Sequence, residues 1–243
     1  MNFAKSVLAA IPLAMMVSPI HAGPTQFVVV PNNRASTLAN DSSGSLAGSI
    51  GSFEFEDVFD RFQFPTAGGP LLITQIAFRL KPGTGGINAT VTSAAIYMST
   101  TSYAPYTNGG NTLLTTNFAT NRGPDNTLVA SLGPGTLWSS PGCTGSTTCP
   151  FDIVFRFSTP FLYDPSKGFL LTDMQFTGYQ GVGTGQFDVE HYAVNPVVAE
   201  INAAGGSPTG ALEFSDNVVQ FGYTSVPAGT CLVGLTLRAR RWA

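Results

Sequence analysis

Residues 53–62 carry a run of acidic side chains that could bind a metal ion. The segment reads FEFEDVFDRF and supplies Glu54, Glu56, Asp57 and Asp60. Carboxylate oxygens are ligands of hard cations, so the four acids are a candidate calcium site. An edge strand also carries such charges, because they discourage pairing with the edge of another sheet. We favour the charged edge strand and keep calcium as the alternative.

Catalytic chemistry finds little support in the residue types. After residue 22 the chain has one histidine, His191, and the sequence contains neither a nucleophile-elbow pattern nor zinc-ligand spacing. A glycosidase would need two carboxylates. The acids available for such a pair are Glu54, Glu56, Asp57, Asp60, Asp173 and Glu190. Since nothing in the sequence selects two of them, we expect a non-catalytic protein without a cofactor. A polysaccharide-acting enzyme with a carboxylate pair is the alternative.

Three aromatic residues in or beside predicted loops are candidates for ligand contact. They are Tyr103, Tyr106 and Trp138. An exposed aromatic face can stack on a sugar ring. Packing in the core or anchoring of a loop explains the same residues, and this is the interpretation that we favour.

Two cysteines are close enough to form a local disulfide. Cys143 and Cys149 bound a tip rich in Gly, Ser and Thr, and Cys231 is left over. In an exported protein such a pair is expected to be oxidised. Closing so short a loop stabilises the fold by about 2 kcal/mol in the chain-entropy model.

The charge distribution argues against nucleic acid as a partner. Between residues 23 and 225 seven basic residues stand against 14 acidic ones. Binding phosphates requires a basic face, which this part of the chain cannot supply. An acidic exterior suits an exported protein.

Composition and periodicity predict an all-β fold. The chain contains 27 Gly, 17 Pro and 18 Phe, and only 10% of its residues are charged. Such a composition favours many short strands joined by turns. Turn signals recur at the spacing that is typical of sandwiches. We predict one antiparallel β-sandwich of jelly-roll type over residues 23–225, with a long loop at 102–126.

Residues 151–176 form the clearest structural signal. Apolar and polar residues alternate from Phe151 to Phe157, which predicts a half-buried strand. The sequence DPSKG at 164–168 predicts a chain reversal. A second apolar run follows at 169–176, and we predict that it returns beside the first strand as a hairpin. Residues 71–80 and 89–100, separated by PGTGG, are predicted to pair in the same way.

Residues 1–22 have the layout of a secretory signal peptide. Lys5 provides the positive charge, an apolar stretch covers residues 7–17, and Ala22 lies at the expected cleavage site. The apolar stretch is too short to cross a bilayer of about 30 Å. The sequence therefore predicts export by the secretion machinery.

The end of the chain resembles the PEP-CTERM sorting signal of Gram-negative bacteria. That signal has a Val-Pro-Glu-Pro-Gly-Thr-like motif, an apolar helix and a terminal Arg cluster. The residues that match it are Val226, Pro227, Gly229, Thr230, Arg238, Arg240 and Arg241. Ala228 stands where the signal has Glu-Pro. Segments within residues 71–173 are similar to uncharacterised exported proteins that carry this tail.

This resemblance implies a location and a class of partner. Proteins with the signal are associated with exopolysaccharide and biofilm matrix, and an exosortase-type enzyme processes them. We therefore expect an exported protein of the cell surface or extracellular matrix of a Gram-negative bacterium, acting in adhesion or exopolysaccharide contact. A purely structural matrix component is a further alternative.

Overall fold

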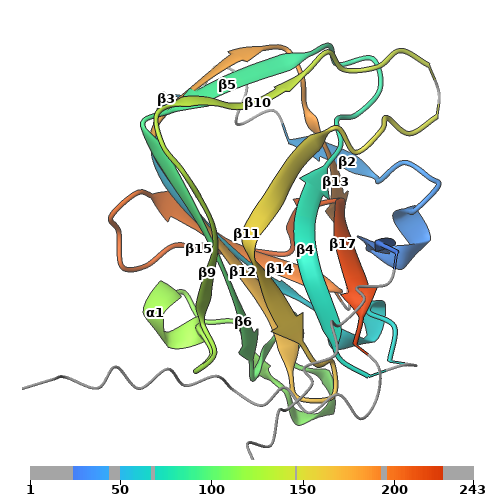
Figure 1. Ribbon diagram of the computed structural model, residues 1–243, viewed down its shortest axis with the longest axis vertical. Helices are drawn as coiled ribbons and strands as arrows, with labels where there is room; N and C mark the ends of the chain where they lie inside the picture. The colour runs from blue at the N-terminus through green and yellow to red at the C-terminus, as the bar shows by residue number, and fades with distance from the viewer. Residues whose placement is uncertain (1–23, 44–49, 67–68, 146, 193–195, 227–243) are drawn as a thin grey trace, which may run out of the picture.

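The computed structural model describes residues 24–43, 50–66, 69–145, 147–192 and 196–226 (Figure 1). The predicted signal peptide and Cys231 lie outside the described residues. So do Pro227, Gly229, Thr230, Arg238, Arg240 and Arg241 of the predicted sorting signal. Val226 is the last described residue, and its N–H donates to the carbonyl of Pro70 at 3.1 Å.

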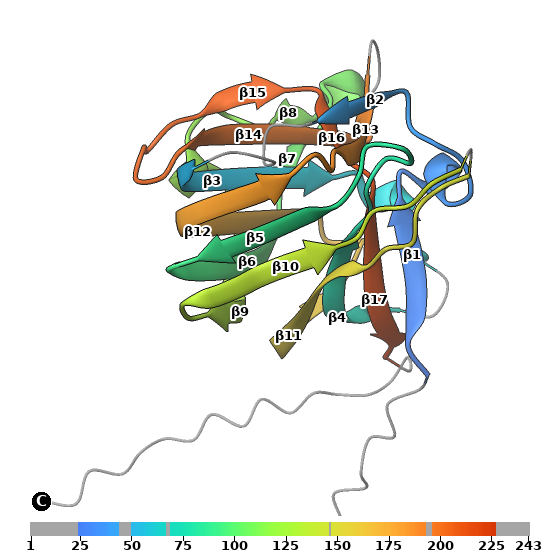
Figure 2. The same ribbon diagram turned by 90° about the horizontal axis from the view of Figure 1, so that it is seen from above.

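Two antiparallel sheets pack together (Figure 2). The first sheet has four strands, in the order β1 (Gln26–Val30), β17 (Val219–Ser225), β4 (Leu71–Phe78) and β11 (Ile153–Tyr163). The second has eight strands. Its main order is β10 (Gly135–Ser140), β5 (Ile87–Val91), β12 (Phe169–Gly183), β3 (Ile50–Phe59), β14 (Val198–Ala204) and β15 (Ala211–Glu213). The all-β sandwich is confirmed, whereas the jelly-roll connectivity stays a prediction.

The remaining strands extend these sheets or form small ones. Strand β6 (Ser93–Thr101) pairs with β12 and with β9 (Thr127–Leu132). A three-stranded sheet has the order β16 (Ser215–Asn217), β13 (Phe187–His191) and β2 (Asp41–Ser43). Strands β7 (Tyr103–Ala104) and β8 (Thr112–Leu113) form a short parallel pair.

Helices are few and short in the described part of the chain. They are η1 (Asn32–Arg34), η2 (Arg61–Gln63), η3 (Asn108–Gly110) and α1 (Phe118–Asn121). Within the described ranges, no helix has the length and apolar character needed to cross a membrane.

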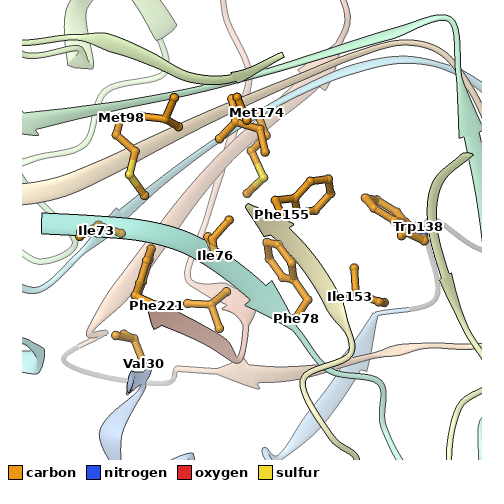
Figure 3. Packing of buried hydrophobic residues seen from close by; sticks show 14 of the residues in the cluster. Val30, Ile73, Ile76, Phe78, Met98, Trp138, Ile153, Phe155, Met174 and Phe221 are labelled. Carbon is orange, nitrogen blue, oxygen red and sulfur yellow. The ribbon is translucent and has the colours of Figure 1, made fainter. Parts of the chain in front are cut away.

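The main core lies between the two large sheets (Figure 3). Alternation along each strand sends every second side chain into this space. The four-stranded sheet contributes Ile73, Ile76 and Phe221, and the eight-stranded sheet contributes Met98 and Met174. All five side chains are buried.

A second apolar cluster covers the other face of the eight-stranded sheet. It contains Val58, Ala104, Leu114, Phe118, Phe169, Leu171, Ala199 and Ile201. Part of this cluster comes from β3, β12 and β14, and the rest comes from residues 102–126, which include β7, β8 and α1. The segment that we predicted as a long loop is therefore a covering layer. Both faces of the sheet are consequently buried around β3.

The predicted hairpin at 151–176 is wrong in its pairing. Residues 153–163 and 169–183 are strands, and the turn between them lies where expected. However, β11 pairs with β4, whereas β12 pairs with β3, β5 and β6. The chain crosses from one sheet to the other at the turn, so the two strands belong to opposite sheets. The predicted pairing of 71–80 with 89–100 fails in the same way, because β5 pairs with β10 and β12.

The predicted edge strand at residues 53–59 is also wrong. Strand β3 has β12 on one side and β14 on the other, so it lies inside the sheet. Its acids are therefore not a device that protects an exposed edge.

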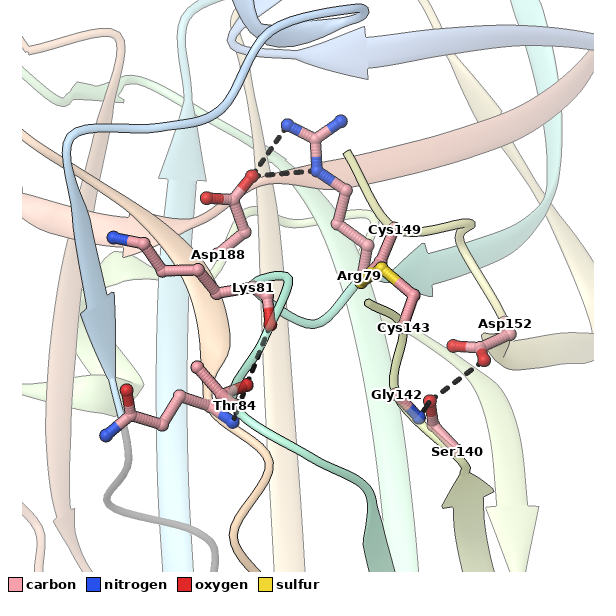
Figure 4. Close-up of a disulfide and its surroundings, with 10 residues drawn as sticks. Arg79, Lys81, Thr84, Ser140, Gly142, Cys143, Cys149, Asp152 and Asp188 are labelled. Atoms are coloured by element: carbon pink, nitrogen blue, oxygen red, sulfur yellow. Dashed lines mark hydrogen bonds and ion pairs between the residues drawn. A yellow bond between two sulfur atoms is a disulfide. The ribbon is translucent and has the colours of Figure 1, made fainter. Parts of the chain in front are cut away.

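The predicted disulfide is present (Figure 4). Cys143 and Cys149 are bonded, with their Cα atoms 5.6 Å apart. The carbonyl of Cys143 accepts a hydrogen bond from the N–H of Gly83 at 2.9 Å. The disulfide closes a loop before β11, and this hydrogen bond joins the loop to the turn between β4 and β5.

Trp138 belongs to the core, which confirms the packing that we favoured for this residue over ligand contact. Its side chain is 7% exposed. Its ring lies 5.7 to 6.0 Å from the rings of Phe155, Phe176, Tyr179 and Phe187. The register of β10 shifts between Thr136 and Trp138, and the consecutive residues Leu137 and Trp138 are both buried in the main core, which the sequence around them did not reveal.

We predict that Trp138→Ala lowers the free energy of unfolding by about 3 to 5 kcal/mol, because it leaves a cavity among four rings. Urea denaturation measures this loss. Trp138→Phe is the matched control and should lose clearly less. A loss below about 1 kcal/mol for the alanine variant would contradict the central packing of this side chain.

Candidate functional site

A groove of about 750 Å³ opens beside the turn that joins β11 to β12. This volume lies in the range of small-ligand sites. The groove is lined by Pro70, Thr100, Thr101, Ser102, Tyr103, Thr120, Arg122, Gly123, Pro124, Asp125, Leu162, Asp164 and Lys167. Three parts of the chain meet here: the end of β6, the loop after α1, and the turn at 164–168.

The end of β6 is tied to α1 by one side chain. The hydroxyl of Thr101 donates to the carbonyl of Asn121 at 2.6 Å, and it accepts from the N–H of Tyr103 at 3.2 Å. Tyr103 is half-buried and packs against the outer apolar cluster. Its position in the groove is therefore supported from behind.

The loop after α1 lies directly against β6. Asp125 accepts from the N–H of Thr100 at 2.7 Å, and the N–H of Gly123 donates to the hydroxyl of Ser99 at 3.1 Å. A Cβ at Gly123 would collide with the carbonyl of Thr100. Glycine is required here because the two backbones approach so closely.

The turn at 164–168 closes the groove on the other side. Asp164 accepts from the N–H of Ser166 at 3.0 Å, and the N–H of Lys167 donates to the carbonyl of Asp164 at 2.9 Å. A Cβ at Gly168 would meet the carbonyl of Thr101. The turn is therefore both closed on itself and packed against β6.

Arg122 connects the groove to acids on the outer face of the eight-stranded sheet. Its Nη2 lies 2.7 Å from a carboxylate oxygen of Glu54 and 2.7 Å from one of Asp173. Its Nε lies 3.4 Å from Glu56. The arginine side chain is 27% exposed, whereas those of Glu56 and Asp173 are 0% exposed. The guanidinium group of Arg122 thus forms ion pairs with three carboxylates.

Burial changes the acidity of this network. Loss of solvation raises the pKa of Asp173 to about 6, although Arg122 acts in the opposite direction. Burial likewise raises the pKa of Glu56 to about 8, opposed by a hydrogen bond of 2.8 Å from Asn121. These two carboxyls hold their protons more tightly than exposed acids do.

Only one of the three predicted aromatic contacts lies in the groove. Tyr103 lines it. The ring of Tyr106 meets Phe169 edge-on at 6.2 Å, and its hydroxyl donates to Asp60 at 3.4 Å, which anchors a loop. Trp138 lies in the main core.

The four acids predicted as a calcium site do not converge. Alternation along β3 sends Glu54 and Glu56 to Arg122 on the outer face and Asp57 to the inner face. Asp60 follows the strand and accepts from the N–H of Phe62 at 3.1 Å, where it caps η2. As a single set, the predicted ligands are wrong.

The acid beside His191 has a structural partner. Glu190 accepts from Arg34 at 2.7 and 2.8 Å, a bidentate ion pair. The backbone N–H of His191 donates to Asn40 at 2.8 Å. These contacts join β13 to the segment before β2.

Sequence reasoning missed most of the groove. Residues 120–125 carry Arg122 and Asp125 in a segment without periodicity, so no pattern marked them. Asp164 and Lys167 were assigned to a turn, which is correct, but their approach to β6 depends on a crossover between sheets.

Comparisons with protein-family models, with curated proteins and with solved structures gave no match to this chain. The structural class of this protein is therefore described from its fold and its groove alone. It is an antiparallel β-sandwich with a groove between the end of β6, the loop after α1 and the turn that joins β11 to β12.

We predict that part of the stability of this protein decreases as the pH rises from about 5 to about 7.5. Asp173 has a pKa of about 6 when folded and an ordinary value of 3.8, so the folded state holds the extra proton between these values. This contribution to stability is complete below an ordinary pKa of 3.8, decreases as the pH rises through about 6, and is gone by about pH 7.5. Between about pH 5 and about pH 7.5, the free energy of unfolding should fall by about 1.4 kcal/mol less in Asp173→Asn than in the unaltered protein. This difference corresponds to about 3 to 6 °C in Tm.

Thermal unfolding of Asp173→Asn at several pH values tests this dependence. Asp41→Asn changes an exposed acid in the same way and is the matched control. Equal pH slopes for Asp173→Asn and the unaltered protein would show that Asp173 does not titrate in this range.

Proposed function

We propose that this chain is an exported protein of the cell surface or extracellular matrix that contacts exopolysaccharide through the groove beside Tyr103. The observation that carries the proposal is the position of this half-buried aromatic side chain among hydroxyl and charged groups. No other predicted aromatic contact has such surroundings in the described residues.

The lining of the groove suits a chain of sugar rings. A tyrosine ring can stack on the apolar face of a sugar, and a ring that is held from behind loses little freedom on binding. Thr100, Thr101 and Ser102 supply hydroxyls, which can both donate and accept hydrogen bonds. Lys167 is exposed at the rim and could meet an acidic sugar.

Both ends of the sequence and the disulfide support export of this protein. Residues 1–22 have the layout of a signal peptide, and the resemblance of residues 226–243 to a PEP-CTERM signal suggests processing by an exosortase-type enzyme. The Cys143–Cys149 disulfide suits an oxidising compartment outside the cytoplasm. The secretion machinery and the matrix of a Gram-negative bacterium are the partners and location that follow.

Binding is better supported than hydrolysis by the position of the acids. Glu56 and Asp173 come together through Arg122, but both side chains are fully buried and a glycosidic bond could not reach them. Asp125 and Asp164 line the groove, and each already supports the local backbone through accepted hydrogen bonds. We therefore propose a non-catalytic contact.

Affinity electrophoresis against a panel of exopolysaccharides tests the groove. We predict that Tyr103→Ala weakens binding about 10-fold, the effect of losing one stacking contact. Tyr97→Ala is the matched control, because Tyr97 is also half-buried but does not line the groove. Its affinity should stay within about 2-fold of the unaltered protein.

The same polysaccharides distinguish the alternative functions. Release of reducing ends would support a polysaccharide-acting enzyme. Failure of every polysaccharide to retard the protein would favour a structural matrix component and would overturn the proposed contact. Equal loss of binding in Tyr103→Ala and Tyr97→Ala would place the contact elsewhere.

A further inference from the structure

Three carboxylates converge on the inner face of the eight-stranded sheet. Asp57 on β3 stands directly opposite Glu200 on β14 in the strand register. Asp216 comes from β16, in the three-stranded sheet. One carboxylate oxygen from each residue lies within 4.8 Å of the other two.

Among the described residues, no arginine or lysine forms an ion pair with these three acids. Asp57 is 2% exposed and Asp216 is 3% exposed. Within the described ranges, the ion pairs of arginine and lysine go to other acids: Glu54, Glu56, Asp173, Asp188 and Glu190. Burial and mutual repulsion raise the pKa of Asp57 and of Asp216 well above their ordinary values. Such a cluster needs protons or a cation.

The hydrogen bonds leave an oxygen free on each aspartate. Thr172 donates to Oδ2 of Asp57 at 3.3 Å, and the backbone N–H of Asn217 donates to Oδ1 of Asp216 at 2.5 Å. The remaining oxygens, Oδ1 of Asp57 and Oδ2 of Asp216, are buried without a hydrogen-bond partner among the described residues. Holding one oxygen while leaving the other free is how supporting residues orient metal ligands.

A neutral oxygen lies beside the same cavity as two of these acids. Oδ1 of Asn217 is also buried without a partner, and Asn217 lines a cavity of about 40 Å³ together with Asp57 and Glu200. These unpartnered atoms are all acceptors, and one cation with several oxygen ligands would satisfy them together. Oxygen-only sets of this kind suit hard cations. Two ligands of one calcium ion are at most about 5 Å apart, which agrees with the observed cluster.

We propose that Asp57, Glu200 and Asp216 bind one hard divalent cation, with Ca²⁺ as the expected ion. Asn217 would add an amide oxygen. The cation would join β3 and β14 to β16, and so fasten the three-stranded sheet to the sandwich. This site is separate from the groove and does not depend on the proposed contact with polysaccharide.

Calorimetry with the full chain, treated with EDTA and then titrated with CaCl₂, tests the site. We expect one Ca²⁺ per chain and a rise in Tm of about 5 to 15 °C at saturation. Trp138 lines the same cavity, so its fluorescence should change with the same midpoint. Trp242→Phe removes the second tryptophan of the chain and isolates this signal.

Asp57→Asn and Asp216→Asn locate the site. Each should weaken Ca²⁺ binding by at least about 10-fold and lose the rise in Tm. In EDTA each should be at least as stable as the unaltered protein, because a neutral amide replaces a carboxyl that must otherwise be protonated or repel its neighbours. Asp41→Asn, which changes an exposed acid, should keep the full response, as should Tyr103→Ala in the groove.

Three results would decide whether the proposed cation site exists. A response to Mg²⁺ or Mn²⁺ in place of Ca²⁺ would support the site and correct the ion. No binding of any of the three ions to the EDTA-treated chain would overturn the proposal and assign protons to the cluster. Unchanged Ca²⁺ binding in both asparagine variants would also overturn it, because the ion would then lie elsewhere.

Discussion

The burial of both faces of the eight-stranded sheet is the constraint on which the rest of this structure depends. The four-stranded sheet covers one face, and residues 102–126 help to cover the other. Strand β3 lies in the middle of this arrangement with neighbours on both edges. Moving an unpaired charge into such a place costs several kcal/mol, so every acid on β3 must be protonated, paired or coordinated. The alternation of the strand divides these acids between two environments.

The groove follows from the same layers. Residues 102–126 leave β6, cover the outer face and return as β9, and this path brings Arg122 over the acids of β3 and β12. The arginine is held by Glu54 and Asp173 while part of its side chain stays exposed. The lining of the groove is therefore anchored to the sheet through an ion-pair network. Loops fixed in this way can present polar groups with little loss of entropy when a ligand binds.

Local sequence patterns predicted the strands well and their partners poorly. Alternation at 151–157 and the turn at 164–168 are local properties, and both appear in the structure. Pairing depends on which surfaces the whole chain buries, and β11 and β12 belong to opposite sheets that bury side chains in one shared core. The same reason explains why β3 was wrongly predicted as an edge strand. A strand with alternating charged residues looks like an edge strand unless the layer that covers its charged face, here residues 102–126, is known. Trp138 was ambiguous because a single aromatic residue beside a turn fits a core and a surface equally well.

The acids of β3 show how one strand can carry two different solutions to the same electrostatic problem. On the outer face Glu54 and Glu56 share the positive charge of Arg122, and Asn121 donates to Glu56 at 2.8 Å, so a protein side chain supplies the compensating charge. On the inner face Asp57 meets two further acids and no cationic side chain among the described residues. An arginine on the inner face could neutralise Asp57 in the way that Arg122 neutralises the acids of the outer face. The absence of one among the described residues near Asp57, together with buried oxygens that have no hydrogen-bond donor, is what an external cation would require.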